Sequence, residues 1–352
     1  MTILLTGVTG LVGCHAAIAL VKAGHDVVTL ARGAGNLSTT QRVRQTLQAY
    51  PGWNGAATHL SRASAVGGNM RSVLCGLDAS DRDRWRGQIE AVVNCAGSVT
   101  FGDRDSDLNV NTDGVLQLLN LSHDLECHRV LHISTAYVPH GNSPCRTPYE
   151  ESKLRGEQIL QEFSAKHEIE AVTLRPSIVT GDRRYGFTPT FNGLYPFLRF
   201  AAIYWGRIGH LAPEDWFPRS LLRTGTINLL PADMLGSSIV EILDNWDAAS
   251  PILTLINPTD WRLDDFAETV YACLTAAKGC APPENGRSKE PPKRVLQSLL
   301  DLYAPYMEVS PGVHPDSGVI LPGGGQNALS NDQSWIASLI DWGIETDWQE
   351  PI

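Results

Sequence analysis

Three kinds of functional pattern are missing from this chain of 352 residues. It has no run of about 18 apolar residues, the length a helix needs to span a bilayer, so we predict no membrane span. The seven cysteines contain no Cys-x-x-Cys pair and are odd in number, which favours a reducing compartment over a disulfide framework. The ten histidines show no His-Glu-x-x-His spacing, and we predict no metal site.

Positive charge is scarce as well. The chain has 28 Lys and Arg against 38 Asp and Glu, a net charge of −10, which gives no electrostatic reason to expect a nucleic-acid partner. A predicted strand begins almost at Met1 and leaves no room for a signal peptide. With 43% hydrophobic and 19% charged residues, the composition is typical of a globular protein. We expect a cytoplasmic one.

The first half of the chain alternates short β-rich runs with helical patterns, which predicts a parallel sheet covered on both faces. Strands are expected at 3–5, 27–30, 72–74, 91–94, 130–133 and 171–174. Helices are expected at 11–23, 38–50 and 108–124, and from Tyr149 onward, with residues 51–68 as a loop.

The composition changes after Gly181. Residues 186–217 hold nine aromatic side chains. Such a density could form the apolar wall of a substrate pocket, ordinary core, or a contact between two copies of the chain. The sequence leaves these alternatives open.

The run Thr6-Gly7-Val8-Thr9-Gly10-Leu11-Val12-Gly13 lies between a predicted strand and a predicted helix. In that context the three glycines permit a tight turn, a close approach of the backbone to a pyrophosphate, and packing of helix on strand. The N-terminus of the helix offers unpaired N–H groups to phosphates. We therefore predict a bound dinucleotide.

This turn and the alternation of elements predict an α/β fold with a Rossmann-type, doubly wound parallel sheet and a smaller, mostly helical C-terminal substrate-binding part. We assign residues 1–181 to the dinucleotide-binding domain, with 226–261 returning to it. Residues 182–225 and 262–352 are assigned to the substrate-binding part.

The second predicted strand ends in Leu30-Ala31-Arg32, where an NAD-preferring fold usually has an acidic residue for the ribose 2′-hydroxyl. A guanidinium at this place suits a 2′-phosphate instead. Arg42, in the following helix, is a second candidate for the same contact. The alternative for Arg32 is a solvated surface arginine, but the sequence favours NADP.

Tyr149 and Lys153 are four residues apart at the start of a predicted helix, so both side chains can point into one site. A phenol has a pKa of about 10, and a nearby ammonium is expected to lower the pKa of Tyr149 and make it a usable proton donor and acceptor. Ser134 and Thr135 follow the fifth predicted strand, at the edge where open α/β sheets place their sites. Either hydroxyl could hold a substrate carbonyl oxygen, or could satisfy backbone groups.

These motifs resemble the extended short-chain dehydrogenase/reductase superfamily. Several stretches are similar to its acyl-thioester reductase branch, which includes fatty acyl-CoA reductases and the reductase domains of peptide synthetases. The stretches are Leu108–Gly114, His132–Val138, Tyr149–Glu157 and Arg175–Gly181.

The resemblance implies that Tyr149 is the general acid, that Lys153 lowers its pKa and holds the nicotinamide ribose, and that Thr135 orients the carbonyl. Asn109 matches the family's asparagine, with an expected structural or proton-relay role. The residues predicted to bind the dinucleotide are Thr6, Gly7, Thr9, Gly10, Leu11, Val12, Gly13, Arg32, Arg42, Leu77, Asp78, Cys95, Ala96, Gly97, Tyr149, Lys153, Pro176 and Ile178.

The implied activity is NADPH-dependent reduction of an acyl thioester to an aldehyde or alcohol. The chain holds no carrier or adenylation segment, so we expect the acyl group to arrive in trans, on coenzyme A or a carrier protein, and an oligomer is compatible with the sequence. Only 13 residues separate Thr135 from Tyr149, fewer than is usual in the family, and the turn-rich Pro139–Pro144 is expected to close this segment.

Two other functions stay open. One is reduction of a free ketone or aldehyde, or epimerisation or dehydration of a sugar nucleotide, although Ser177-Ile-Val-Thr-Gly replaces the Asn-x-Tyr-Gly-Pro typical of sugar-nucleotide relatives. The other is a non-catalytic NADP sensor, which often lacks the Tyr or the Lys.

Overall fold

The computed structural model describes residues 1–53, 61–99, 108–139, 143–208, 224–277, 305–307, 318–320 and 332–350. The predictions for residues 140–142 and for Trp216 and Phe217 lie outside these ranges. Within them, no helix is long and apolar enough to cross a membrane.

A parallel sheet of eight strands forms the centre of the described molecule, in the order β12-β10-β6-β5-β4-β1-β2-β3. The strands are β1 (Thr2–Thr6), β2 (Asp26–Ala31), β3 (Ala63–Gly67), β4 (Ala91–Asn94), β5 (Arg129–Ile133), β6 (Glu170–Pro176), β10 (Ile252–Leu255) and β12 (Gly318–Ile320). The order reverses direction between β1 and β4, as in a doubly wound sheet, and the predicted fold class is confirmed. β12 comes from the range that the sequence assigned to the substrate-binding part.

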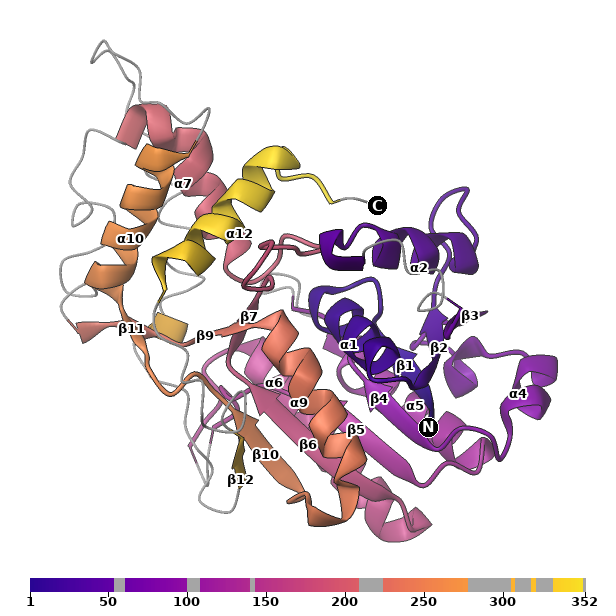
Figure 1. Ribbon diagram of the computed structural model, residues 1–352. Coiled ribbons are helices and arrows are strands. Elements are labelled where there is room, and N and C mark those ends of the chain that lie inside the picture. Colours follow the sequence, from indigo (N-terminus) through magenta and orange to yellow (C-terminus); the bar gives the residue numbers. More distant parts are fainter. Residues whose placement is uncertain are drawn as a thin grey trace.

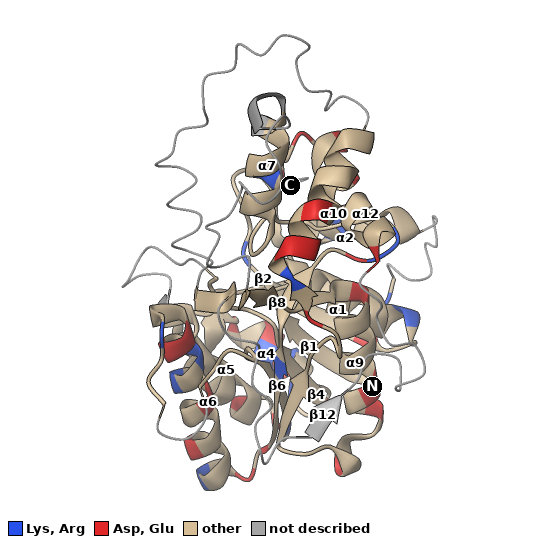
Figure 2. Ribbon diagram, turned by 90° about the vertical axis from the view of Figure 1, so that its left-hand side faces the viewer, with Lys and Arg blue, Asp and Glu red and all other residues tan. Residues whose placement is uncertain are grey.

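Helices cover both faces of the sheet (Figures 1 and 2). One layer holds α1 (Leu11–Lys22), α2 (Thr39–Gln48) and α9 (Ala232–Asp244); the other holds α4 (Ala79–Trp85), α5 (Asp113–Asp124) and α6 (Pro148–His167). Side chains of β1 alternate between the layers, since Ile3 and Leu5 belong to the core under α1 and Leu4 to the core under α5. Short 3₁₀ helices lie at Pro51–Trp53, Val73–Gly76, Leu108–Val110 and Trp246–Ala248.

The predicted third strand at 72–74 is wrong. The strand is Ala63–Gly67, inside the predicted loop, and Val73–Gly76 forms a 3₁₀ turn in which Leu74 and Cys75 have positive φ angles. β3 is the edge strand next to β2, and its Ala-Ser-Ala-Val-Gly sequence has small, partly exposed side chains. Such a strand lacks the apolar run that marks the buried strands.

A second unit of helices lies beyond the carboxyl ends of the strands (Figure 1). It comprises α7 (Tyr195–Ile208), α10 (Leu263–Ala276) and α12 (Gln333–Glu345), which share one hydrophobic core. Two small sheets adjoin it: β7 (Ile178–Thr180) pairs with β9 (Leu229–Pro231), and β8 (Thr226–Ile227) pairs with β11 (Trp261–Arg262).

The aromatic segment after Gly181 forms core rather than a pocket wall. Six of its side chains are at most 9% exposed and line neither of the cavities described below: Phe187, Phe191, Tyr195, Phe197, Phe200 and Trp205. The sequence left open a pocket wall, ordinary core or a contact between copies, and these six side chains belong to the core.

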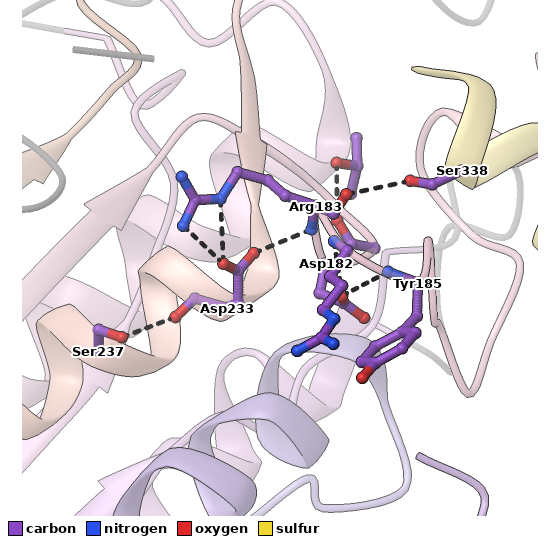
Figure 3. Close-up of polar contacts among 9 residues, drawn as sticks. Asp182, Arg183, Tyr185, Asp233, Ser237 and Ser338 are labelled. Atoms are coloured by element: carbon purple, nitrogen blue, oxygen red, sulfur yellow. Dashed lines mark hydrogen bonds and ion pairs between the residues drawn. The ribbon is translucent and has the colours of Figure 1, made fainter. Parts of the chain in front are cut away.

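The loop that follows β7 joins the second unit to the sheet (Figure 3). Arg183 donates from Nε and Nη2 to Oδ2 of Asp233 on α9, at 3.1 and 3.0 Å. Ser338 of α12 donates from Oγ to the Arg183 carbonyl at 3.4 Å. Asp182 Oδ1 accepts the Tyr185 N–H at 2.9 Å and so fixes the turn between these contacts.

Candidate active site and dinucleotide groove

The turn between β1 and α1 depends on glycine. Gly7 has a φ of +76°, and its carbonyl accepts the Gly10 N–H at 2.9 Å. A Cβ at Gly13 would lie 2.2 Å from the Gly7 oxygen. Gly10 caps α1 without a side-chain hydrogen bond, so the N–H groups of the first turn have no acceptor within the helix. This arrangement fits a pyrophosphate.

A cavity of about 460 Å³ opens at this turn. Eight residues predicted to bind the dinucleotide line it: Gly7, Thr9, Gly10, Arg32, Arg42, Cys95, Ala96 and Gly97. Four further lining residues were not indicated by the sequence: Gly68, Asn69, Met70 and Arg71. They follow β3 directly, and they were missed because that strand was placed too late in the sequence.

Three guanidinium groups belong to this cavity, from Arg32, Arg42 and Arg71. Arg42 Nη1 donates to the Arg32 carbonyl at 3.1 Å, which holds the two residues together at the end of β2. Glu350 also contributes to the lining. With three arginines and one glutamate, the lining of this cavity has an excess of positive charge, which suits a phosphate.

A second cavity, of about 230 Å³, shares Gly10, Cys95, Gly97, Thr190 and Asn192 with the first, so the two are neighbouring parts of one groove. The remaining predicted residues that line it are Leu11, Val12, Gly13, Thr135, Tyr149, Lys153, Pro176 and Ile178. The rest of its wall is formed by Val99, Ile133, Ser134, Tyr137, Ser177, Val179, Gly193 and Tyr306. Tyr306 comes from a segment far along the chain, where the resemblance to the family is loose.

Tyr149 lies in the first turn of α6, which Thr147 caps by accepting the Glu150 N–H at 3.2 Å. The Tyr149 and Thr135 side chains are hydrogen-bonded to each other. Burial raises the pKa of Tyr149, nearby Tyr306 adds to the rise, and the hydrogen bond with Thr135 opposes it. Tyr149 is therefore protonated at neutral pH and can act as an acid.

Lys153 is buried one turn further along α6 and donates from Nζ to the Ile133 carbonyl at 3.0 Å. Burial lowers the pKa of Lys153 to about 8, against opposing effects of Cys95 and Glu157. The pKa of Tyr149 is raised and not lowered, so the predicted net lowering is wrong, while the effect of Lys153 itself stays a prediction. Removal of the phenol from water outweighs the other influences, and the pKa rises.

Asn111, rather than Asn109, holds the backbone beside this pair. Asn111 Oδ1 accepts the Ser98 N–H at 2.9 Å, and Nδ2 donates to the Ser98 carbonyl and to Ser152 Oγ, both at 3.0 Å. Asn111 is buried, whereas Asn109 is exposed and lines neither cavity. The two lie in one Asn-x-Asn stretch, and the sequence alone did not distinguish them.

Three predicted dinucleotide contacts also line neither cavity. Thr6 Oγ1 donates to Asn94 Oδ1 at 2.7 Å and accepts the Ala96 N–H at 3.0 Å, so it ties two strand ends together. Leu77 is buried in the core under α5. Asp78 caps α4 by accepting the Asp81 N–H at 2.8 Å.

Most of this chain is similar in sequence to known proteins. A model of the NAD-binding family described as male sterility protein matches residues 5–144 and 139–239. A linear gramicidin synthase polypeptide of Brevibacillus parabrevis is 23% identical over 286 residues, 76% of this chain and 5% of that protein. The L-2-aminoadipate reductase large subunit of Eremothecium gossypii is 24% identical over 264 residues, 66% of this chain and 18% of that protein. The chain thus spans only a small part of either relative.

Solved structures of the same fold cover nearly the whole chain. The terminal R domain from the myxalamid PKS-NRPS biosynthetic pathway has a TM-score of 0.72 at 22% identity, over 99% of this chain and 92% of that one. UDP-glucose 4-epimerase from Bifidobacterium longum, in complex with NAD⁺ and UDP, has a TM-score of 0.61 at 17% identity, over 99% of each chain. At these identities the likeness shows the fold, and with the family match it confirms the resemblance that the sequence motifs indicated.

Proposed function

Since this chain belongs to the male sterility protein family, an NAD-binding family, we propose that it is an NADPH-dependent reductase of acyl thioesters. The observation that carries the proposal is the hydrogen-bonded pair of Thr135 and Tyr149 beside Lys153, in a cavity that adjoins the glycine turn. When bound, the reduced dinucleotide supplies a hydride, which with one proton converts an acyl thioester to an aldehyde and a thiol.

The residues of the chain have separate tasks in this proposal. Thr135 and Tyr149 hold the carbonyl oxygen of the substrate, and Tyr149 gives that oxygen its proton. The raised pKa of Tyr149 suits this direction of reaction, because the phenol keeps its proton until the oxygen becomes basic. Lys153 contributes positive charge to the nicotinamide end of the groove.

NADP, rather than NAD, is the proposed dinucleotide because Arg32, Arg42 and Arg71 line the larger cavity of the groove. We further propose that the unit of α7, α10 and α12, which lies beyond the strand ends, is the substrate-binding part. The substrate would be delivered on coenzyme A or on a carrier protein; the R domain to which this chain is similar comes from a PKS-NRPS pathway.

The test is the oxidation of NADPH by the purified chain, followed at 340 nm, with a set of acyl-CoA and carrier-bound acyl substrates. We expect turnover with at least one thioester and release of free thiol. Tyr149→Phe removes the proton donor and should lower the rate by about 10²- to 10⁴-fold, while NADPH binding persists. Turnover of free ketones or sugar nucleotides, with none for any thioester, would contradict the proposal.

A further inference from the structure

A buried ion pair joins α6 to β6, one helical turn from Lys153. Arg175, on β6, donates from Nε to Glu157 Oε1 at 3.0 Å and from Nη2 to Glu157 Oε2 at 2.5 Å. The arginine is 4% exposed and the glutamate 9%. Both charges lose their contact with water, so a buried pair of this kind is weak evidence for stability. Stability alone is a poor reason for its presence beside the groove.

Glu157 and Lys153 lie on one face of α6. They are four residues apart and both buried, and helical side chains lean toward the N-terminus, so the Glu157 carboxylate leans toward the turn that carries Lys153. Lys153 Nζ donates to the Ile133 carbonyl of β5, the strand that pairs with β6. A Cβ added to Gly97, which lines both cavities, would lie 3.0 Å from the same Nζ. The ammonium thus lies at the cavity wall, with the carboxylate one turn further along the helix.

The other titratable groups that act with Lys153 are neutral at pH 7. Burial lowers the pKa of Lys153, while Cys95 and Glu157 oppose that shift. Burial raises the pKa of Cys95 to about 12, so this thiol carries no charge. Burial also raises the pKa of Tyr149, and burial with the Lys153 charge lowers the pKa of His132 to about 3. Among these neighbours in the described part of the chain, Glu157 supplies the negative charge.

We propose that Glu157 is a positioning residue that keeps Lys153 in its charged, dinucleotide-binding form, and that Arg175 holds the Glu157 carboxylate in place. The inference rests on the proposed role of Lys153 in the groove and does not depend on which substrate is reduced. Loss of the carboxylate removes its attraction for the ammonium and leaves the Arg175 guanidinium without a counter-ion. Both effects disfavour the positive charge of Lys153, which is then lost at a lower pH.

The test is the titration of the Lys153 amine, followed by NMR in the chain without dinucleotide. The chain has six lysines, so protein with isotope-labelled lysine gives few signals, and the Lys153 signal is the one absent from Lys153→Met. We expect a wild-type midpoint near pH 8. Glu157→Gln keeps the side-chain size and an acceptor for Arg175, and should lower this midpoint by about one pH unit or more. Glu162→Gln removes an exposed carboxylate from the same helix and should leave the midpoint unchanged.

NADPH binding provides a second readout. The dissociation constant for NADPH, measured by fluorescence titration, should begin to rise about one pH unit lower in Glu157→Gln than in the wild-type chain. A glutamate that only ties α6 to β6 would change stability and move neither the midpoint nor this rise. The double variant Glu157→Met/Arg175→Met removes both buried charges together and answers for a single variant that does not fold. Its Lys153 midpoint should also lie below that of the wild-type chain.

An unchanged Lys153 midpoint in folded Glu157→Gln or in the double variant would overturn the inference. An equal shift in Glu162→Gln would do so as well, because it would trace the effect to the charge of the whole molecule. A lowered midpoint with no change in the pH dependence of NADPH binding would also overturn it, since the charge would then not serve the dinucleotide.

Neither readout uses a thioester, so the inference and the proposed function fail separately. A chain that reduces no thioester but shows both shifts contradicts the proposed function and supports the inference. A chain that reduces thioesters without the shifts supports the proposed function and contradicts the inference.

Discussion

Tyr149 and Lys153 show which part of a residue's chemistry a sequence can predict. Their spacing of four places both on one face of α6 and in one cavity, as expected. Their pKa values do not follow from spacing, because burial disfavours the charged form of both groups. It raises the pKa of the phenol and lowers that of the ammonium. Depth of burial depends on the whole fold, and the predicted lowering of the Tyr149 pKa is wrong for that reason.

The lowered pKa of Lys153, about 8, predicts how dinucleotide binding depends on pH. Below pH 8 the amine is protonated and attracts the anionic ligand; above it the charge is lost. We expect the dissociation constant for NADPH to rise between pH 7 and 9, by up to about 10-fold per pH unit. Fluorescence titration with NADPH at each pH measures this dissociation constant.

Lys153→Met should bind NADPH more weakly and without pH dependence over the same range. Lys166→Met removes an exposed lysine at the other end of α6 and should keep the wild-type profile. A wild-type affinity that stays flat from pH 7 to 9 would refute this role for Lys153.

At the scale of elements, strands with buried apolar runs were predictable and the edge strand was not. β4 lies at Ala91–Asn94, as expected, because Val92 and Val93 are buried between two helix layers. β3 escaped prediction because its side chains are small and half exposed. That error also concealed Arg71, whose place in the groove depends on where β3 ends.

The packing of α12 against the loop after β7 requires a glycine at position 186. Its φ is +63°, and a Cβ there would lie 1.9 Å from the Ser338 carbonyl oxygen of α12. Since backbone meets backbone, no side-chain rotation relieves this contact. We expect Gly186→Ala to lower the free energy of unfolding by about 3 kcal/mol or more, as measured by urea denaturation.

Gly35→Ala separates steric clash from backbone strain. Gly35 has a φ of +53° with nothing within 4 Å of an added Cβ, so this variant should lose only about 1 to 2 kcal/mol. Equal decreases in the free energy of unfolding for Gly186→Ala and Gly35→Ala would contradict the close packing of α12 against Gly186.

At the scale of the whole molecule, the fold could be predicted from the glycine turn and the alternation of elements, but the complete groove could not. Thr190, Asn192 and Tyr306 join the cavities from loops and from a segment distant in sequence. Nothing local marks such residues, because their role arises only when the second unit packs beyond the strand ends. The aromatic segment suggested a pocket wall, ordinary core or a contact between copies, and the six of its side chains that the structure describes as buried form core, since aromatic density indicates burial and not exposure to a ligand.

Charge distribution over the whole molecule leads to the last prediction. The chain carries a net charge of −10, yet three arginines line the larger cavity of the groove. The net charge gives no general attraction of anions, so in the proposed function local contacts to the 2′-phosphate hold NADPH. We expect Arg71→Ala and Arg32→Ala each to weaken NADPH binding by about 10-fold or more and to leave NADH binding unchanged, as measured by calorimetry. Arg44→Ala, on α2 but outside both cavities, should affect neither ligand. Equal losses for NADPH and NADH would place these arginines away from the 2′-phosphate and remove the argument for NADP.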